Sequence, residues 1–188
     1  MNKKEMQSKL QKALKKKRFE HSLGVRDEAA RMAERFGADT EKAYIAGLLH
    51  DCAKCLKPEE EKELITQYGY ELDEMTRLCH PVLHAPLGAL VARHEYGVED
   101  EEILDAIRYH TVARADMTLL DKIVYIADVT EPNRDYDGVE LIRRLAAKNI
   151  DDAYKEAVRQ ALTHNIKKET IIHPNTLDAW NEICRKKL

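Results

Sequence analysis

Histidine and aspartate side chains stand beside the most apolar stretches of this chain, where a polar group needs a specific partner. His50 and Asp51 are consecutive and fall near the end of the apolar segment 41–54, and Asp128 follows a second apolar stripe at 123–127. Burying a carboxylate is costly unless a metal ion or a neighbouring Lys or Arg accompanies it. The alternative to a metal ligand is a buried aspartate satisfied by backbone caps or by Lys54.

Three further histidines, His21, His84 and His110, also fall beside apolar helical positions. A single histidine on an apolar face is usually a satisfied core residue, but several of them with two core aspartates indicate a metal site. Neutral imidazole and carboxylate are ligands suited to zinc, iron, manganese or nickel.

The cysteines do not indicate a thiolate metal site. There are four of them, at positions 52, 55, 79 and 184, and only the first two form a CxxC pair. A structural zinc site would need a second pair close by, and a thioredoxin-like role would need a βαβ context. We therefore expect reduced cysteines without a metal or redox role.

The order His21, His50-Asp51, Asp128 resembles the H…HD…D signature of the HD-domain superfamily of metal-dependent phosphohydrolases. The strings RFEHSLGV, LLHDCAK, HAPLGA, RYHT and IVYIADVTEPNR resemble in particular the YqeK family of bacterial HD-domain hydrolases, over about residues 18–134. That resemblance implies symmetrical bis(5'-nucleosyl)-tetraphosphatase activity on a phosphoanhydride bond, which splits diadenosine tetraphosphate into two ADP.

The resemblance also implies a two-metal centre. The first metal would be held by His21, His50, Asp51 and Asp128, and the second by His84, His110 and a bridging Asp51. It suggests iron in both sites, whereas residue chemistry alone equally allows manganese or another divalent ion. Two ions about 3.5–4 Å apart can activate a water molecule and neutralise phosphate charge.

Cations near these positions are candidates for contacts with the phosphates. Lys54 lies four residues after His50, and Arg18 three before His21, so each would share a helical face with its histidine. We expect catalytic roles for Asp51 and Lys54, substrate contacts from Arg18, Lys54, Arg134 and Thr111, and supporting contacts from Thr111 and Glu131. For each cation the alternative is an ordinary surface charge.

Other polar and aromatic residues have a weaker case. His80 and His94 are left out of the metal set, and His164 and His173 have no supporting context. Tyr109, Tyr125 and Tyr136 could stack on a base, but we favour places in the core for them. The basic run 12–18 is either a solvated helix face or a basic rim for a polyanionic substrate.

The elements that would position these residues are helices. In 188 residues there are only seven Gly and five Pro, and 35% of residues are charged, which favours helix over sheet. We predict helices at 3–16, 18–36, 41–54, 58–67, 72–78, 81–96, 100–110, 119–131, 138–147, 150–165 and 176–187. Residues 170–173 could be extended, but a single short strand would have no evident partner. The expected fold is an all-α, single-domain irregular helical bundle over 1–188, with a metal-site core at about 18–134 and C-terminal helices at 138–188.

Charge and hydropathy exclude several other classes of protein. No apolar run approaches the roughly 20 residues that a membrane span needs, and the N-terminus lacks the apolar core of a signal peptide. A net charge of −3 gives no general attraction for nucleic acid. We expect a cytoplasmic protein with a small-molecule nucleotide substrate and no membrane or nucleic-acid partner; a homodimer is left open.

Two alternatives to the tetraphosphatase remain at this point. The same metal pair could serve a nucleotidase or phosphodiesterase acting on another nucleotide. The chain could instead be a non-catalytic metal- or nucleotide-binding sensor.

Overall fold

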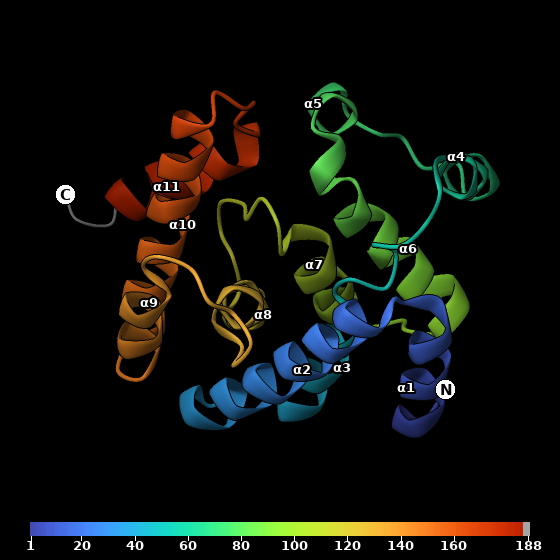
Figure 1. Ribbon diagram of the computed structural model, residues 1–188, viewed down its shortest axis with the longest axis horizontal. Helices are drawn as coiled ribbons and strands as arrows, with labels where there is room; N and C mark the ends of the chain where they lie inside the picture. The colour runs from blue at the N-terminus through green and yellow to red at the C-terminus, as the bar shows by residue number, and fades with distance from the viewer. Residues whose placement is uncertain (186–188) are drawn as a thin grey trace.

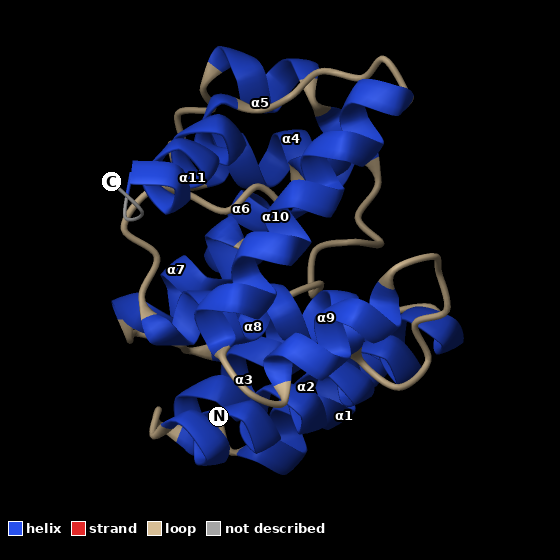
Figure 2. Ribbon diagram, turned by 90° about the vertical axis from the view of Figure 1, so that its left-hand side faces the viewer, coloured by secondary structure: helices blue, strands red, loops and turns tan. Residues whose placement is uncertain are grey.

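The computed structural model describes residues 1–185, and within them it is built of helices and loops without a β-strand (Figure 2). The first six α-helices are α1 (Lys3–Ala13), α2 (Lys16–Phe36), α3 (Thr40–Leu49), α4 (Pro58–Gln67), α5 (Glu74–Leu78) and α6 (His84–Tyr96). The next five are α7 (Glu101–Tyr109), α8 (Leu119–Thr130), α9 (Val139–Ala146), α10 (Ile150–Lys167) and α11 (Pro174–Arg185), and a short 3-10 helix, η1 (His80–Val82), precedes α6. The all-α prediction is confirmed.

Helix α3 is the central element of the fold, in contact with α2, α7 and α8. Its Ala43, Ala46, Leu48 and Leu49 are fully buried, as expected for a helix that is apolar nearly all round. Gly47 permits the close approach of α2, because a Cβ at this position would lie only 2.9 Å from the Cα of Arg26. The C-terminal end of α3 is thereby held in the interior.

Side-chain caps explain where the two central helices begin. Asp39 accepts hydrogen bonds from the backbone N–H groups of Glu41 and Lys42 at the start of α3. Thr118 and Asp121 form a reciprocal capping box at the start of α8. Both caps satisfy N–H groups that have no partner within the helix.

The third helix ends earlier than its apolar pattern predicts. Its last residue is Leu49, not Lys54, and the chain continues through tight turns in which Cys52 N–H donates to the Leu49 carbonyl and Lys54 N–H to that of Asp51. Apolarity alone does not distinguish a buried helix from a buried turn, which explains the error. The argument that Lys54 shares a helical face with His50 was therefore wrong.

The C-terminal part of the fold packs on α8. Helix α10 contacts α8, α9 and α11, and Figure 1 shows these last helices on one side of α8, with α2 and α3 on another. Residues 170–173 are not a strand, and the predicted end of the last helix at 186–187 lies outside the described residues. No helix among the described residues has both the length and the apolarity needed to cross a membrane.

Candidate metal centre

Four histidines from different parts of the fold direct their Nε2 atoms toward one buried point. The Nε2 atoms of His21 and His50 are 3.2 Å apart, and those of His84 and His110 are 3.3 Å apart. All four residues are at least nine-tenths buried. Helices α2, α3, α6 and α7 therefore each bring one imidazole to the same place.

Hydrogen bonds at Nδ1 fix the orientation of three of these rings. His50, His84 and His110 each lie 2.7–2.9 Å from a carbonyl oxygen three residues earlier, namely Gly47, Pro81 and Ile107. His50 and His110 are the C-caps of α3 and α7, where the last carbonyls lack partners within the helix. For His50 and His110 the helix ends thus favour a proton on Nδ1 and leave Nε2 as an acceptor.

The two close pairs of Nε2 atoms favour a positive ion beside each pair. Two imidazole acceptors 3.2–3.3 Å apart repel each other unless positive charge lies near both lone pairs. Burial disfavours a proton on His50, yet the charges of Asp51 and Asp128 raise its pKa, so the centre attracts positive charge. The donor set of imidazole nitrogen and carboxylate oxygen suits a divalent transition metal.

Asp51 stands between the two histidine pairs. Its Oδ2 lies 3.3 Å from Nε2 of His50, and its Oδ1 lies 3.0 Å from Nε2 of His84. The side chain is 3% exposed. One carboxylate thus presents one oxygen to each side of the centre.

Asp128 faces the first pair from helix α8. Its Oδ1 lies 3.0 Å from Nε2 of His21 and 3.7 Å from Nε2 of His50. Three overlapping groups bring potential ligand atoms within 4.8 Å of one another: His21, His50 and Asp51; His50, His110 and Asp128; and Asp51, His84 and His110. All six ligand candidates from the sequence therefore lie together.

Charge states in the centre suit metal binding. Burial opposes ionisation of Asp51, but the neighbouring imidazoles, His50 foremost, hold the pKa of its carboxyl far below the ordinary value. Burial together with His50 and His84 lowers the pKa of His110 to about 3. An ionised Asp51 and a neutral His110 are the forms of these two side chains that bind metal ions.

Arginine side chains pair with both carboxylates of the centre. Arg18 Nη1 donates to Oδ2 of Asp51 at 2.7 Å. Arg134 donates twice to Asp128, from Nη2 to Oδ1 at 2.5 Å and from Nε to the backbone carbonyl at 2.7 Å. The guanidinium groups are about one-third exposed, so they stand between the buried centre and solvent.

Lys54 reaches the same opening from the turn after α3. Its Nζ lies 2.9 Å from Nδ1 of His84 and 3.4 Å from the carbonyl of Pro81. Burial lowers the pKa of the Lys54 ammonium. A turn, rather than the expected helical face, brings this cation to the centre.

His21 of the buried centre lines a cleft of about 700 Å³. Arg18, Lys54 and Arg134 line it, together with Lys15 and Lys17 from the basic run. Part of the basic run 12–18 therefore lies beside the buried centre, in agreement with the basic-rim interpretation. The five cations outnumber the two carboxylates of the lining, Glu20 and Glu131, so the cleft attracts a polyanion.

Glu131 and Thr111, which the sequence predicts to make supporting contacts, lie in different parts of the structure. The Nδ1 of His21 lies 3.1 Å from Oε1 of the buried Glu131, the contact that fixes this fourth ring. The hydroxyl of Thr111 is buried, has no hydrogen-bond partner within residues 1–185, and lines a separate hollow, not the basic cleft. Glu131 thus touches the centre directly, whereas Thr111 only follows His110 in the chain.

The sequence did not single out Arg143, which holds the loop after α8. Its guanidinium donates to the backbone carbonyls of Thr130, Glu131 and Arg134. Such a contact depends on how α9 packs against the loop, and only the amphipathic pattern of α9 hints that Arg143 faces inward. Arg143 therefore helps position both Glu131 and Arg134.

Several residues set aside in the sequence lie away from the centre. His80 is exposed and pairs with Glu61, and His94 stacks on Tyr68. The four cysteines are free thiols. The expectation of a core position is confirmed for Tyr125, which is 4% exposed, but is wrong for Tyr136, which is 39% exposed because it follows Pro132 in a surface loop.

Comparison with known families identifies the same region. The HD domain family matches residues 18–133, the part of the chain that contains all six candidate ligands. A protein of Bacillus subtilis strain 168 is 40% identical over 184 residues, covering 96% of this chain and 97% of its own length. A protein of Staphylococcus aureus is 36% identical over 170 residues, covering 89% and 87%. Both are named symmetrical bis(5'-nucleosyl)-tetraphosphatases.

A solved structure extends the similarity to the whole fold. A crystal structure of a predicted HD superfamily hydrolase involved in NAD metabolism, from Clostridium acetobutylicum, superimposes with a TM-score of 0.94. The two chains are 39% identical, and the match covers 99% of this chain and 98% of the other. The helical arrangement is thus the same from the first helix to the last.

Proposed function

Because the chain belongs to the HD domain family, we propose that it is a metal-dependent hydrolase that cleaves diadenosine tetraphosphate symmetrically into two ADP. The observation that carries this function is the position of Asp51, with one oxygen toward His50 and the other toward His84. Its partner Arg18 lines the cationic cleft. The two relatives named for this activity match nearly the whole chain.

The geometry supports a division of the six ligand candidates between two ions. His21, His50, Asp51 and Asp128 would hold one ion, and Asp51, His84 and His110 a second. Once bound, the ions would act as Lewis acids toward phosphate oxygens and activate a water nucleophile. The buried donors keep the site rigid and exclude bulk water, which strengthens every charge interaction within it.

The cations of the cleft would hold the polyphosphate during this reaction. Arg134 lies against Asp128 and Lys54 against His84, so the two charges stand beside different ligands of the centre. Each would then neutralise one half of a symmetrical tetraphosphate, including the charge that develops on the departing ADP. Arg18, paired with Asp51, would contact the phosphates nearest the cleaved bond.

Product analysis tests the proposed function directly. Metal-replete protein is incubated with diadenosine tetraphosphate, and the nucleotides are separated by ion-exchange chromatography. ADP as the sole product is the expected result. Equimolar AMP and ATP would mean that the bond is cleaved asymmetrically, and an unchanged substrate would contradict hydrolase activity.

The two alternatives from the sequence are not favoured by the comparisons. A nucleotidase or phosphodiesterase on another nucleotide would release inorganic phosphate or a nucleoside monophosphate in a substrate panel. A non-catalytic sensor would bind nucleotide without turnover.

Five finer points stay proposals. We propose iron as the bound metal and two ions per chain. We also propose that the chain is one domain, that it works in the cytoplasm, and that it forms a homodimer. Elemental analysis of gently purified protein and light scattering test the metal and the oligomeric state.

A further inference from the structure

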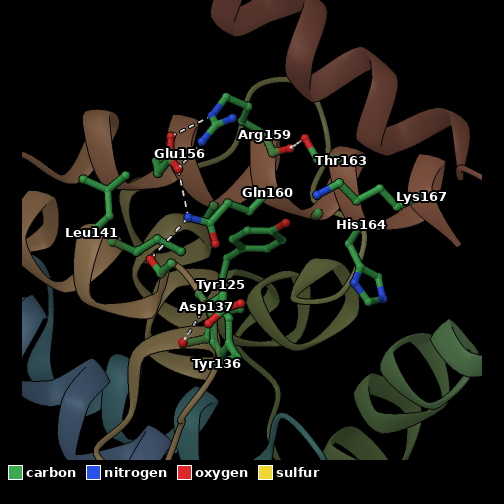
Figure 3. A pocket seen from close by; sticks show the side chains of 15 residues that line it. Tyr125, Tyr136, Asp137, Leu141, Glu156, Arg159, Gln160, Thr163, His164 and Lys167 are labelled. Carbon is green, nitrogen blue, oxygen red and sulfur yellow. Dashed lines mark hydrogen bonds and ion pairs between the residues drawn. The ribbon is translucent and has the colours of Figure 1, made fainter.

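A second hollow, of about 610 Å³, lies between α8, α9 and α10, outside the basic cleft. Figure 3 shows Tyr125 directed into it from α8, with Tyr136 below and Gln160 and His164 of α10 opposite. Leu141 of α9 closes one side. We term this space the tyrosine hollow, after Tyr125 and Tyr136.

Residues of the tyrosine hollow are close in sequence to residues of the candidate metal centre. Tyr125 lies one helical turn before Asp128 on α8. Tyr136 lies two residues after Arg134, whose guanidinium pairs with Asp128. The negative charge of Asp128 contributes, after burial, to the raised pKa of Tyr125, which places the phenol within electrostatic reach of the centre.

The lining has the chemistry of a nucleobase site. Tyr136 is an exposed aromatic ring, yet its hydroxyl donates to the Val129 carbonyl at 3.0 Å, which holds the ring in place. Gln160 donates to the Glu156 carboxylate and to the carbonyl of Gly138, while its own carbonyl accepts no hydrogen bond from the described part of the chain. An aromatic face with an amide at its edge matches a flat, polar-edged base.

We propose that the tyrosine hollow binds one adenine of the dinucleoside tetraphosphate, with its ring on Tyr136 and its edge toward Gln160. This inference rests on the proposed function and deepens it. From the hollow, the phosphate chain would run toward Arg134, which lines the basic cleft and pairs with Asp128. The tyrosine hollow would thus fix which phosphate lies over the centre.

A neighbouring hollow of about 710 Å³ is the competing location. It shares Ala161 and His164 with the tyrosine hollow, but it has no Tyr, Phe or Trp in its described lining. Ile171, which is 47% exposed, lines this second hollow and lies outside the tyrosine hollow. A truncation at Ile171 therefore provides a matched control.

The test measures ADP affinity by titration calorimetry with metal-loaded protein. Tyr136→Ala removes the ring and should weaken ADP binding about tenfold, whereas Tyr136→Phe keeps the ring and should restore most of the affinity. Gln160→Ala should weaken binding about threefold. Ile171→Ala should bind ADP like the parent protein, and all four variants should hold as much metal as the parent.

Two results would overturn the inference. If Tyr136→Ala and Gln160→Ala bind ADP as tightly as the parent, or if Ile171→Ala alone loses affinity, the base does not lie in the tyrosine hollow. In either case the parent protein would still release ADP from diadenosine tetraphosphate, and the proposed function would stand. A parent protein that neither binds ADP nor cleaves the tetraphosphate would contradict both proposals.

Discussion

The Nδ1 atom of His21 lies 3.1 Å from Oε1 of Glu131, a residue 110 positions further along the chain. The other oxygen of Glu131 accepts the backbone N–H of Asn133 at 2.8 Å. This carboxylate therefore fixes the imidazole from behind, so that Nε2 of His21 faces Asp128. A carboxylate behind a ligand histidine orients the ring and increases its basicity.

Removal of Glu131 should weaken metal binding without removing a ligand. We expect Glu131→Ala to lower metal affinity about 10–100-fold, because His21 loses its orienting partner. Glu131→Gln keeps a hydrogen-bond acceptor but removes the charge. Its metal affinity should lie between those of Glu131→Ala and the parent. Competition with a coloured chelator measures the affinity, and Glu34→Ala on the exposed face of α2 is the control. Equal affinities in Glu131→Ala and the parent would disprove the role of this carboxylate.

Gly24 should be required for the same contact. A Cβ at this position would lie 2.5 Å from Oε2 of Glu131, closer than the two atoms can come. Glycine within a helix normally costs up to about 1 kcal/mol relative to alanine, so Gly24→Ala would stabilise α2 if sterics allowed. We instead expect this variant to lose metal affinity by displacing Glu131. A Gly24→Ala protein with raised thermal stability and full metal affinity would refute the steric argument.

The sequence could predict which histidines and aspartates lie together, because residue type and apolar surroundings restrict what a buried His or Asp can do. It could not predict the orienting contacts, since Gly24 and Glu131 meet only when α2 packs beside the end of α8. A glycine inside a long helical pattern was the available signal. The position of Lys54 was anticipated for an incorrect reason, because tight turns rather than a continuing helix follow Leu49.

Lys54 should affect turnover more than metal binding. Its ammonium lies against His84 and lines the cleft, where we propose that it contacts substrate phosphate rather than an ion. We expect Lys54→Ala to lower kcat for diadenosine tetraphosphate about 10–100-fold through lost charge stabilisation, with metal content close to that of the parent. Steady-state kinetics and elemental analysis on the same preparation measure both, with the exposed Lys62→Ala as control. Loss of metal in Lys54→Ala would assign the side chain a structural role.

Arg143 should contribute to stability through the loop that carries Glu131 and Arg134. Its guanidinium makes three hydrogen bonds to backbone carbonyls at 2.8–2.9 Å. Their loss in Arg143→Ala should cost about 2 kcal/mol, which for a chain of this size lowers Tm by roughly 4–8 °C. Calorimetry of metal-free protein separates this effect from metal binding. The neighbouring exposed Arg144→Ala should melt like the parent, and an equal Tm in both variants would contradict the loop assignment.

The position of Tyr136 illustrates what sequence pattern leaves open. Tyrosine suits both a helical core and a ligand surface. Tyr125 is buried in the core, whereas Tyr136 is exposed. Tyr125 belongs to the apolar stripe of α8, whereas Tyr136 follows Pro132 in a loop whose path depends on Arg143. Only the packing of α9 and α10 beside that loop creates the tyrosine hollow.

If two ions share Asp51, the number of metal ions bound per chain depends on its carboxylate. Elemental analysis after loading and desalting should give two ions per chain for the parent protein and one or none for Asp51→Asn, which keeps the shape of the side chain but not its charge. Circular dichroism establishes that the variant is folded. An Asp51→Asn protein that retains both ions would contradict the shared carboxylate and the two-ion centre built on it.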